Sequence, residues 1–255
     1  MRPALVFAYL CSSVLLGAQP LMPWPAGYAA MDGRLGVQAP IHVSWSGFHD
    51  DRLHAAERRW LTRMGDITGL TLFEPDSLPG TTIAVAVDRK GDHLQVGEDE
   101  SYALAIAEGG IRIRATTDLG ALHAFATLYQ LLQRDEQGWY FPHVAINDSP
   151  RFPWRGLLLD VCRHFMPREV VLRELDGLEL VKMNVLHLHL TEDQGFRIES
   201  KLFPELHEQG SEGQYLSQED IRVILREADL RGIRVIPEFD LPGHATSWFV
   251  SHPEL

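Results

Sequence analysis

Three short runs decide the fold class of this chain: residues 156–161 (GLLLDV), 185–190 (VLHLHL) and 234–240 (RVIPEFD). The first run is almost continuously apolar, as expected of a strand that is buried on both faces of a parallel sheet. Helical periodicity fills the segments between them, at 167–181 and 218–231. The alternation of strand and helix predicts the opening of a parallel α/β domain.

This α/β segment covers residues 151–255 and holds about three strand-helix units, whereas a closed (β/α)8 barrel has eight units in about 250 residues. Three parallel strands alone would also leave a long unpaired edge, which folded proteins avoid. We therefore expect an incomplete (β/α)8 TIM barrel, and we interpret the chain as the amino-terminal fragment of a longer protein.

A smaller domain is predicted ahead of the barrel, over residues 41–146. It combines short strand-type runs with two segments of helical spacing, which together predict a small α+β domain. The predicted strands are 41–45, 82–87, 102–106 and 111–115, and the predicted helices are 51–65 and 119–132. The turn-forming run NDSP at 147–150 marks the boundary between the two domains.

The first 18 residues are typical of an export signal. Arg2 supplies positive charge, and residues 4–18 are almost wholly apolar or small. The stretch is shorter than the roughly 20 apolar residues of a spanning helix, so we expect no stable membrane span after cleavage. Residues 19–40, rich in Pro, Gly and Ala, are interpreted as a linker. The protein is therefore expected to be exported, to the periplasm or the medium.

Composition narrows the function classes further. Acidic residues outnumber basic ones by 35 to 23, giving a formal net charge of -12. No segment concentrates Lys and Arg, so we expect no nucleic-acid partner. Cys11 lies in the predicted signal, which leaves Cys162 alone in the mature chain. A single cysteine cannot form an internal disulfide, and we interpret Cys162 as a buried small hydrophobe.

Polar side chains follow each of the three predicted strands. Functional groups of parallel α/β proteins gather at these carboxyl ends. The first end offers Asp160, Arg163 and His164, the second Glu192 and Asp193, and the third Glu238, Asp240 and His244. Three matching clusters predict one site at this edge of the sheet.

Within this site the residues allow both structural and functional roles. Asp160 and Arg163 could form a structural ion pair, although a guanidinium at a strand end also suits neighbouring oxygens such as sugar hydroxyls. Glu192 and His244 follow different strands and could meet across the barrel mouth, where the carboxylate would orient the imidazole.

His187 and His189 are two residues apart and therefore face the same side of the second strand. Such a pair could bind a metal, which leaves a metal-dependent amidohydrolase as an alternative function. Both residues lie inside the strand, however, where hydrogen-bonded core histidines are more common. We therefore predict no metal ligand among them.

Several long motifs stand at the predicted strand ends: RGLLLDVCRHF at 155–165, KMNVLHLHLTEDQGFRIES at 182–200 and RGIRVIPEFDLPGH at 231–244. With DESYALAI at 99–106, they make the chain from about residue 41 onward resemble the β-N-acetylhexosaminidases of glycoside hydrolase family 20. The resemblance implies a (β/α)8 catalytic domain that removes terminal, non-reducing β-linked N-acetylglucosamine or N-acetylgalactosamine from oligosaccharides, including chitin fragments. No metal or organic cofactor is implied.

The resemblance also implies a substrate-assisted, retaining mechanism, in which the sugar's acetamido oxygen attacks the anomeric carbon. Arg163 matches the family's arginine for ring hydroxyls. His244 matches a histidine that pairs with an acidic residue, usually Asp but here Glu192, whose extra methylene moves the carboxylate by about 1.5 Å. Asp160, Asp193, Glu238 and Asp240 are secondary candidates.

The family's catalytic Asp-Glu pair follows a fourth strand, and this chain ends before such a strand. The adjacent acidic pairs at 99–100 and 135–136 belong to the small domain and match nothing catalytic. We therefore expect the 255-residue chain itself to be inactive. A non-catalytic carbohydrate-binding chain or pseudoenzyme remains a further alternative.

Overall fold

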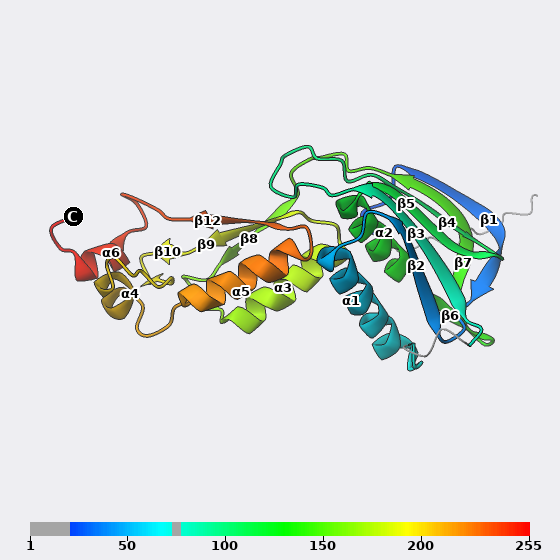
Figure 1. Ribbon diagram of the computed structural model, residues 1–255. Helices are drawn as coiled ribbons and strands as arrows, with labels where there is room; N and C mark the ends of the chain where they lie inside the picture. Colours follow the sequence, from blue (N-terminus) through cyan, green and yellow to red (C-terminus); the bar gives the residue numbers. More distant parts are fainter. Residues whose placement is uncertain (1–20, 73–77) are drawn as a thin grey trace, which may run out of the picture.

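The computed structural model describes residues 21–72 and 78–255, which form two units in sequence order (Figure 1). A seven-stranded sheet with two helices comes first, and a three-stranded parallel sheet with its own helices follows. Within these described ranges, no helix combines the length and the apolar character that a membrane crossing requires.

The first sheet is mixed, in the order β1-β7-β4-β5-β3-β2, with β6 paired to β7. β2, β3 and β5 run parallel to one another, and the remaining pairs are antiparallel. Its strands are β1 (Gly27–Gly36), β2 (Ile41–Gly47), β3 (Thr81–Arg89), β4 (Tyr102–Ala107), β5 (Gly110–Thr117), β6 (Gln133–Asp135) and β7 (Gly138–Asp148).

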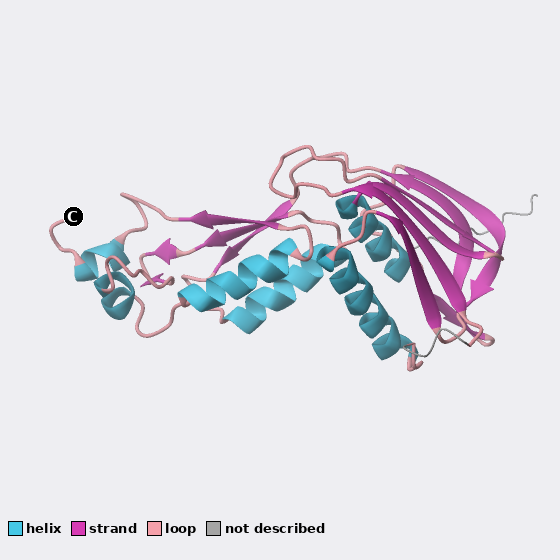
Figure 2. Cartoon of the chain, viewed as in Figure 1, coloured by secondary structure: helices cyan, strands magenta, loops and turns pink. Residues whose placement is uncertain are grey.

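Two helices, α1 (Asp51–Thr68) and α2 (Asp118–Gln130), cover one face of this sheet (Figure 2). β3 shows how the sheet meets them, because Ile83, Val85 and Val87 are at most 1% exposed while the residues between them face outward. Full burial of each such side chain contributes roughly 1.5–3 kcal/mol. Asp50 begins α1 by accepting hydrogen bonds from two backbone N–H groups of the first turn.

The segment 19–40, which we expected to be a linker, contains β1, so this expectation was wrong for residues 27–36. β1 is an edge strand on β7, and most of its side chains are exposed. It therefore lacks the apolar alternation that reveals a half-buried strand. β7 was also missed, although it lies between β1 and β4 in the sheet, because Pro142 and His143 interrupt its apolar pattern.

The second sheet is parallel, as predicted, in the order β12-β9-β8. Its strands are β8 (Gly156–Asp160), β9 (Val185–His189) and β12 (Arg234–Glu238). The helices α3 (Arg168–Leu180) and α5 (Gln218–Asp229) pack on one face, over Leu159, Leu186 and Leu188. Leu158 on β8 points away from this core and is 51% exposed. The arrangement is a partial α/β fold with helices over one face.

Four short elements decorate the carboxyl end of this sheet and were not predicted. They are β10 (Thr191–Glu192), β11 (Gly195–Phe196), α4 (Glu205–Gly210) and α6 (Thr246–Ser251). β10 and β11 pair as a two-stranded antiparallel hairpin. Elements of two to six residues are too short to show a hydrophobic period in sequence.

Helix α1 joins the two units through three arginines on one face. Arg59 lies 2.5 Å from a carboxylate oxygen of Glu179 on α3, and Arg63 lies 2.9 Å from Asp176 on the same helix. The third arginine, Arg52, contacts Asp229 of α5 at 2.8 Å and the fully buried Asp118 at 2.7 Å. We call Arg52, Arg59 and Arg63 the arginine stripe.

A second joint lies at the amino ends of β8 and β9. Glu100, which precedes β4, contacts His123 of α2 at 2.7 Å and pairs with Arg155, which precedes β8. Asn184, which precedes β9, donates to the other carboxylate oxygen at 2.8 Å. Because these side chains come from both units and are buried, they tie the units together. We call Glu100, His123 and Arg155 the joint cluster.

Candidate functional site

The carboxyl ends of β8, β9 and β12 lie side by side, and the site is built from the loops that leave them. Asp160 ends β8, Glu192 lies just beyond β9, and His244 follows β12 by six residues. The structure brings all three, together with Arg163, into one group of contacts. Residues far apart in sequence thus meet at one edge of the sheet.

Glu192 is the centre of this group and is only 1% exposed. Its Oε1 accepts a hydrogen bond from the Arg163 guanidinium and lies 2.5 Å from His244 Nδ1. The side chains of Arg163 and His244 are 52% and 55% exposed, so both present polar groups to solvent while a buried anion holds them. We call Glu192, Arg163 and His244 the open cluster.

Asp160 holds the loop that carries Arg163. One carboxylate oxygen accepts the backbone N–H groups of Cys162 and Arg163 at 2.8 and 3.0 Å, and the other pairs with the Arg163 guanidinium. Burial alone would raise the pKa of Asp160, but these hydrogen bonds lower it below its usual value. Asp160 therefore stays ionised and holds the loop.

The loop after β12 is held by contacts that sequence reasoning missed. Asp193 accepts hydrogen bonds from the Thr246 backbone N–H and hydroxyl, at 3.0 and 2.7 Å, and these bonds lower the pKa of Asp193. Ser247 donates its hydroxyl to the Glu192 carbonyl at 2.6 Å. His244 has a φ of 58°, in the left-handed region that non-glycine residues rarely adopt. The Thr246 and Ser247 contacts stabilise this unusual backbone.

A second set of polar contacts lies between neighbouring strands of the sheet. Glu238 Oε2 lies 2.8 Å from His187 Nε2 and 3.0 Å from His189 Nδ1. Both contacts are within ion-pair distance, but neither has the geometry of a hydrogen bond. The backbone N–H of Asp240 donates to the Thr191 hydroxyl at 2.9 Å, which ties the end of β12 to β10.

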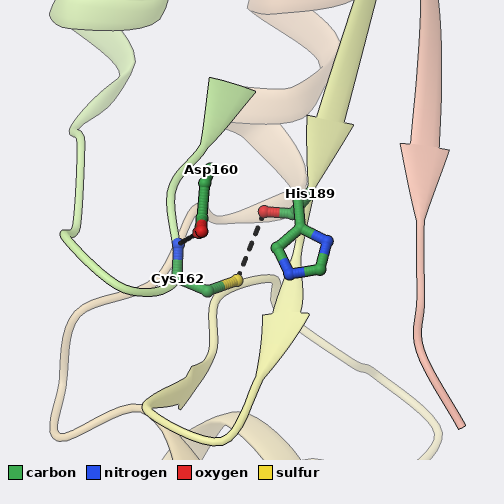
Figure 3. Close-up of side chains that lie close together, drawn as sticks. All are labelled: Asp160, Cys162 and His189. Atoms are coloured by element: carbon green, nitrogen blue, oxygen red, sulfur yellow. Dashed lines mark hydrogen bonds between the residues drawn. The ribbon is translucent and has the colours of Figure 1, made fainter. Parts of the chain in front are cut away.

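The remaining candidates of this region have simpler settings. His164 is exposed beside Arg163. Cys162 is buried, its thiol donates to the His189 carbonyl at 3.2 Å, and burial raises the pKa of this thiol to about 12 (Figure 3). A neutral, buried thiol is a poor nucleophile, so Cys162 has a packing role. Trp248 packs edge-on against Phe196, with ring centroids 5.0 Å apart.

Residue types that bind metals gather in three clusters within the described ranges. Their members are Asp160, Cys162 and His189; His189, Glu238 and Asp240; and Glu192, Asp193 and His244. In the first and third, carboxylates already bind arginine, histidine or backbone N–H groups. In the second, Glu238 already faces two imidazoles. Most of these donor atoms thus contact other groups of the protein, whereas His189 Nε2 has no hydrogen-bond partner among the described residues.

Comparison with known proteins identifies the family. The model of the glycosyl hydrolase family 20 catalytic domain matches residues 152–255, and that of domain 2 of the same family matches residues 18–149. The chain therefore belongs to glycosyl hydrolase family 20. The three-stranded parallel sheet is the start of its catalytic domain, which is a TIM barrel in homologues.

Individual relatives agree with this assignment. The β-hexosaminidase subunit A1 of Dictyostelium discoideum is 38% identical over 185 residues, covering 71% of this chain and 35% of that protein. The structure of Flavobacterium johnsoniae chitobiase matches with a TM-score of 0.84 and 42% identity, covering 92% of this chain and 36% of the other. A Vibrio harveyi exo-β-N-acetylglucosaminidase in complex with N-acetylglucosamine gives 0.75 and 32%, with 92% and 38% covered. The chain spans about a third of the length of the curated relatives it matches.

Proposed function

We propose that the full-length protein hydrolyses terminal, non-reducing β-linked N-acetylglucosamine or N-acetylgalactosamine. The open cluster is the observation that carries this proposal, because it presents Arg163 and His244 to solvent on a buried Glu192 at the carboxyl ends of the strands. Family membership and the names of the relatives support the same class of substrate.

In the proposed reaction the substrate supplies its own nucleophile. The acetamido oxygen attacks the anomeric carbon while a carboxylic acid protonates the leaving oxygen, and water then opens the cyclic intermediate with net retention. Arg163 has guanidinium donors that face solvent and would bind ring hydroxyls. Glu192 would keep His244 oriented at the rim of the sugar site. The Asp-Glu pair of the mechanism would come from sequence beyond the three described strands.

Glu192 stands where the family usually has Asp, and the structure provides for the longer side chain. Its carboxylate still reaches His244 at 2.5 Å and pairs with Arg163. We therefore propose that the acidic-His pair functions with Glu in this position. The predicted signal at residues 1–18 lies outside the described residues, and export remains part of the proposal.

The test is hydrolysis of 4-nitrophenyl N-acetyl-β-glucosaminide and the matching galactosaminide by the full-length protein. We expect turnover that EDTA does not reduce, and none from residues 1–255 alone. Arg163→Lys should lower kcat/KM by about 10- to 100-fold, because a lysine cannot reproduce the charged hydrogen bonds of the guanidinium fork.

Arg222→Lys is the matched control. Arg222 forms an exposed ion pair with Glu219 on α5, away from the strand ends, and its replacement should leave kcat/KM unchanged. Turnover that requires a metal, or robust turnover by the 255-residue chain, would contradict the proposal.

A further inference from the structure

Helix α6, which begins two residues after His244, is held at its start by a side chain from another segment. Its cap residue is Ala245, which has no side-chain acceptor for the first backbone N–H groups of the helix. Asp193, in the turn between β10 and β11, accepts the Thr246 backbone N–H at 3.0 Å and the Thr246 hydroxyl at 2.7 Å. Asp193 therefore does for α6 what a capping side chain does at other helices.

Glu192, the neighbour of Asp193 in sequence, contacts the same loop at two further points. Its carboxylate lies 2.5 Å from His244 Nδ1, and its backbone carbonyl accepts the Ser247 hydroxyl at 2.6 Å. Ala245 and Ser247 are each only 2% exposed, so the chain after His244 is anchored against the protein. Two consecutive residues thus hold both the histidine side chain and the backbone that carries it.

The backbone of His244 needs such support. Its φ of 58° is one that a non-glycine residue keeps only where the surrounding structure holds it. Leu241, Pro242 and Gly243, which precede it, are all exposed. In the described part of the chain, the first hydrogen bonds after His244 that tie this loop to another segment are those of Thr246. The position of the imidazole therefore depends on Thr246 as well as on Glu192.

The charge distribution supports the same connection. Hydrogen bonds from Thr246 are the main cause that lowers the pKa of Asp193, and the nearby His244 and Arg163 lower it further. One ligand-type atom each of Glu192, Asp193 and His244 lie within 4.8 Å of one another. Asp193 is thus an ionised group at the edge of the open cluster, and its hydrogen bonds are directed at the loop that carries His244.

We propose that Asp193 and Thr246 are positioning residues for His244. Their two hydrogen bonds fix the start of α6, and the fixed helix start keeps the imidazole on Glu192 and at the rim of the sugar site. This inference rests on the proposed function, because the sugar site is part of that function.

The first test is hydrolysis of 4-nitrophenyl N-acetyl-β-glucosaminide by full-length variants. Thr246→Val keeps the shape of the side chain but cannot donate to Asp193, and it should lower kcat/KM about tenfold. Asp193→Ala removes the acceptor of both hydrogen bonds and should lower kcat/KM further. Thr246→Ser restores a hydroxyl donor and should recover most of the loss. A Thr246→Val variant as active as the wild type would overturn the inference.

The second test is a double-mutant cycle with His244. If Thr246 acts through His244, the two substitutions must not be additive. In a His244→Asn background, Thr246→Val should therefore change kcat/KM by less than about twofold. A tenfold fall in both backgrounds would show that Thr246 only supports the loop, and it would overturn the positioning role.

Ser251→Ala is the matched control, because it removes a hydroxyl from the same helix. The Ser251 hydroxyl donates to the Trp248 carbonyl within α6, at 3.2 Å, and contacts neither Asp193 nor Glu192. Its replacement should leave kcat/KM unchanged. Thermal unfolding of each variant shows whether the protein is folded, and the comparison uses variants that unfold within a few degrees of the wild type.

The outcomes separate this inference from the proposed function. Hydrolysis with additive effects of Thr246→Val and His244→Asn would overturn the positioning role and leave the function standing. If the wild type shows no hydrolysis, the inference is tested by the NMR signal of the His244 ring C–H, identified by its loss in His244→Asn. That signal should move in Thr246→Val and stay in place in Ser251→Ala; an unmoved signal in Thr246→Val would overturn the inference.

Discussion

The joint cluster and the open cluster use the same three residue types in opposite ways. Each has a buried glutamate between an arginine and a histidine. In the joint cluster the arginine and histidine side chains are also buried, with 15% and 11% exposure. In the open cluster they are 52% and 55% exposed. One cluster lies at the amino ends of the parallel strands and the other at their carboxyl ends.

The two clusters share their composition and differ in exposure, and exposure is what makes the open cluster the candidate site. Arg155 also donates to the carbonyls of Lys182 and Phe152, both at 2.8 Å, so its donors are directed at the protein. Arg163 keeps part of its guanidinium toward solvent, where a ligand can reach it. The exposed Arg163 and His244 side chains can therefore contact a neutral, hydroxyl-rich ligand while they keep their contacts with Glu192.

The largest expected effect comes from removing the charge of each glutamate in turn. Glu100→Gln should lower the free energy of unfolding by about 3–5 kcal/mol, because Arg155 and His123 would stay buried without their anion. Glu192→Gln should lower it by only about 1–2 kcal/mol, since water can solvate Arg163 and His244. Urea denaturation of the two full-length variants measures both free energies of unfolding. Equal decreases in the two variants would contradict the proposed difference between the clusters.

The joint cluster should also make the free energy of unfolding depend on pH. Burial alone would raise the pKa of Glu100, but hydrogen bonds from His123 and Arg155 hold it at about 2, against 4.5 for the free group. The stabilisation is therefore complete above pH 4.5 and is lost as pH falls toward 2, by at most about 3 kcal/mol. Unfolding free energies measured across this range should fall with pH in the wild type. In Glu100→Gln this contribution should be missing at every pH.

A smaller loss of stability is expected from removing a helix cap that lies outside both clusters. Ser217 begins α5 with a capping box, in which its side chain accepts from the Asp220 backbone and Asp220 accepts from the Ser217 backbone. Ser217→Ala should cost about 1 kcal/mol in thermal or urea unfolding and leave hydrolysis unchanged. A loss as large as that of Glu100→Gln would show that the joint cluster is not exceptional.

Sequence reasoning was most successful where burial leaves a periodic signal. The residues of β8, β9 and β12 that face α3 and α5 are apolar. The helices α1, α2, α3 and α5 are long enough to show helical spacing. β1 could not be recognised, because an edge strand with exposed side chains has no such pattern. β7 was hidden by Pro142, which lies in the strand opposite Arg34, where the register of β1 shifts.

Two contacts of the candidate site, Asp160 with Arg163 and Glu192 with His244, were predicted from the sequence, but the pairing of Arg163 with Glu192 was not. The rule that functional groups follow parallel strands is enough to select Arg163, Glu192 and His244. The alignment of Asp160, His189 and Glu238 across β8, β9 and β12 depends on the register of the three strands, which a single sequence does not specify. Thr246 and Ser247 carry no signal of their own, because short hydroxyl side chains occur in every kind of loop.

The arginine stripe has a consequence for the order of events on the ribosome. Its members on α1 are made 113 to 177 residues before their acidic partners on α3 and α5. At about 5–20 residues per second, this delay lasts roughly 6 to 35 s, and amino-terminal domains fold first during synthesis. The first unit can therefore fold before α3 and α5 emerge, with Arg52 already paired to Asp118 and with Arg59 and Arg63 still hydrated. It then offers α3 and α5 a preformed template as they emerge, so that the nascent barrel starts from helices already held in place.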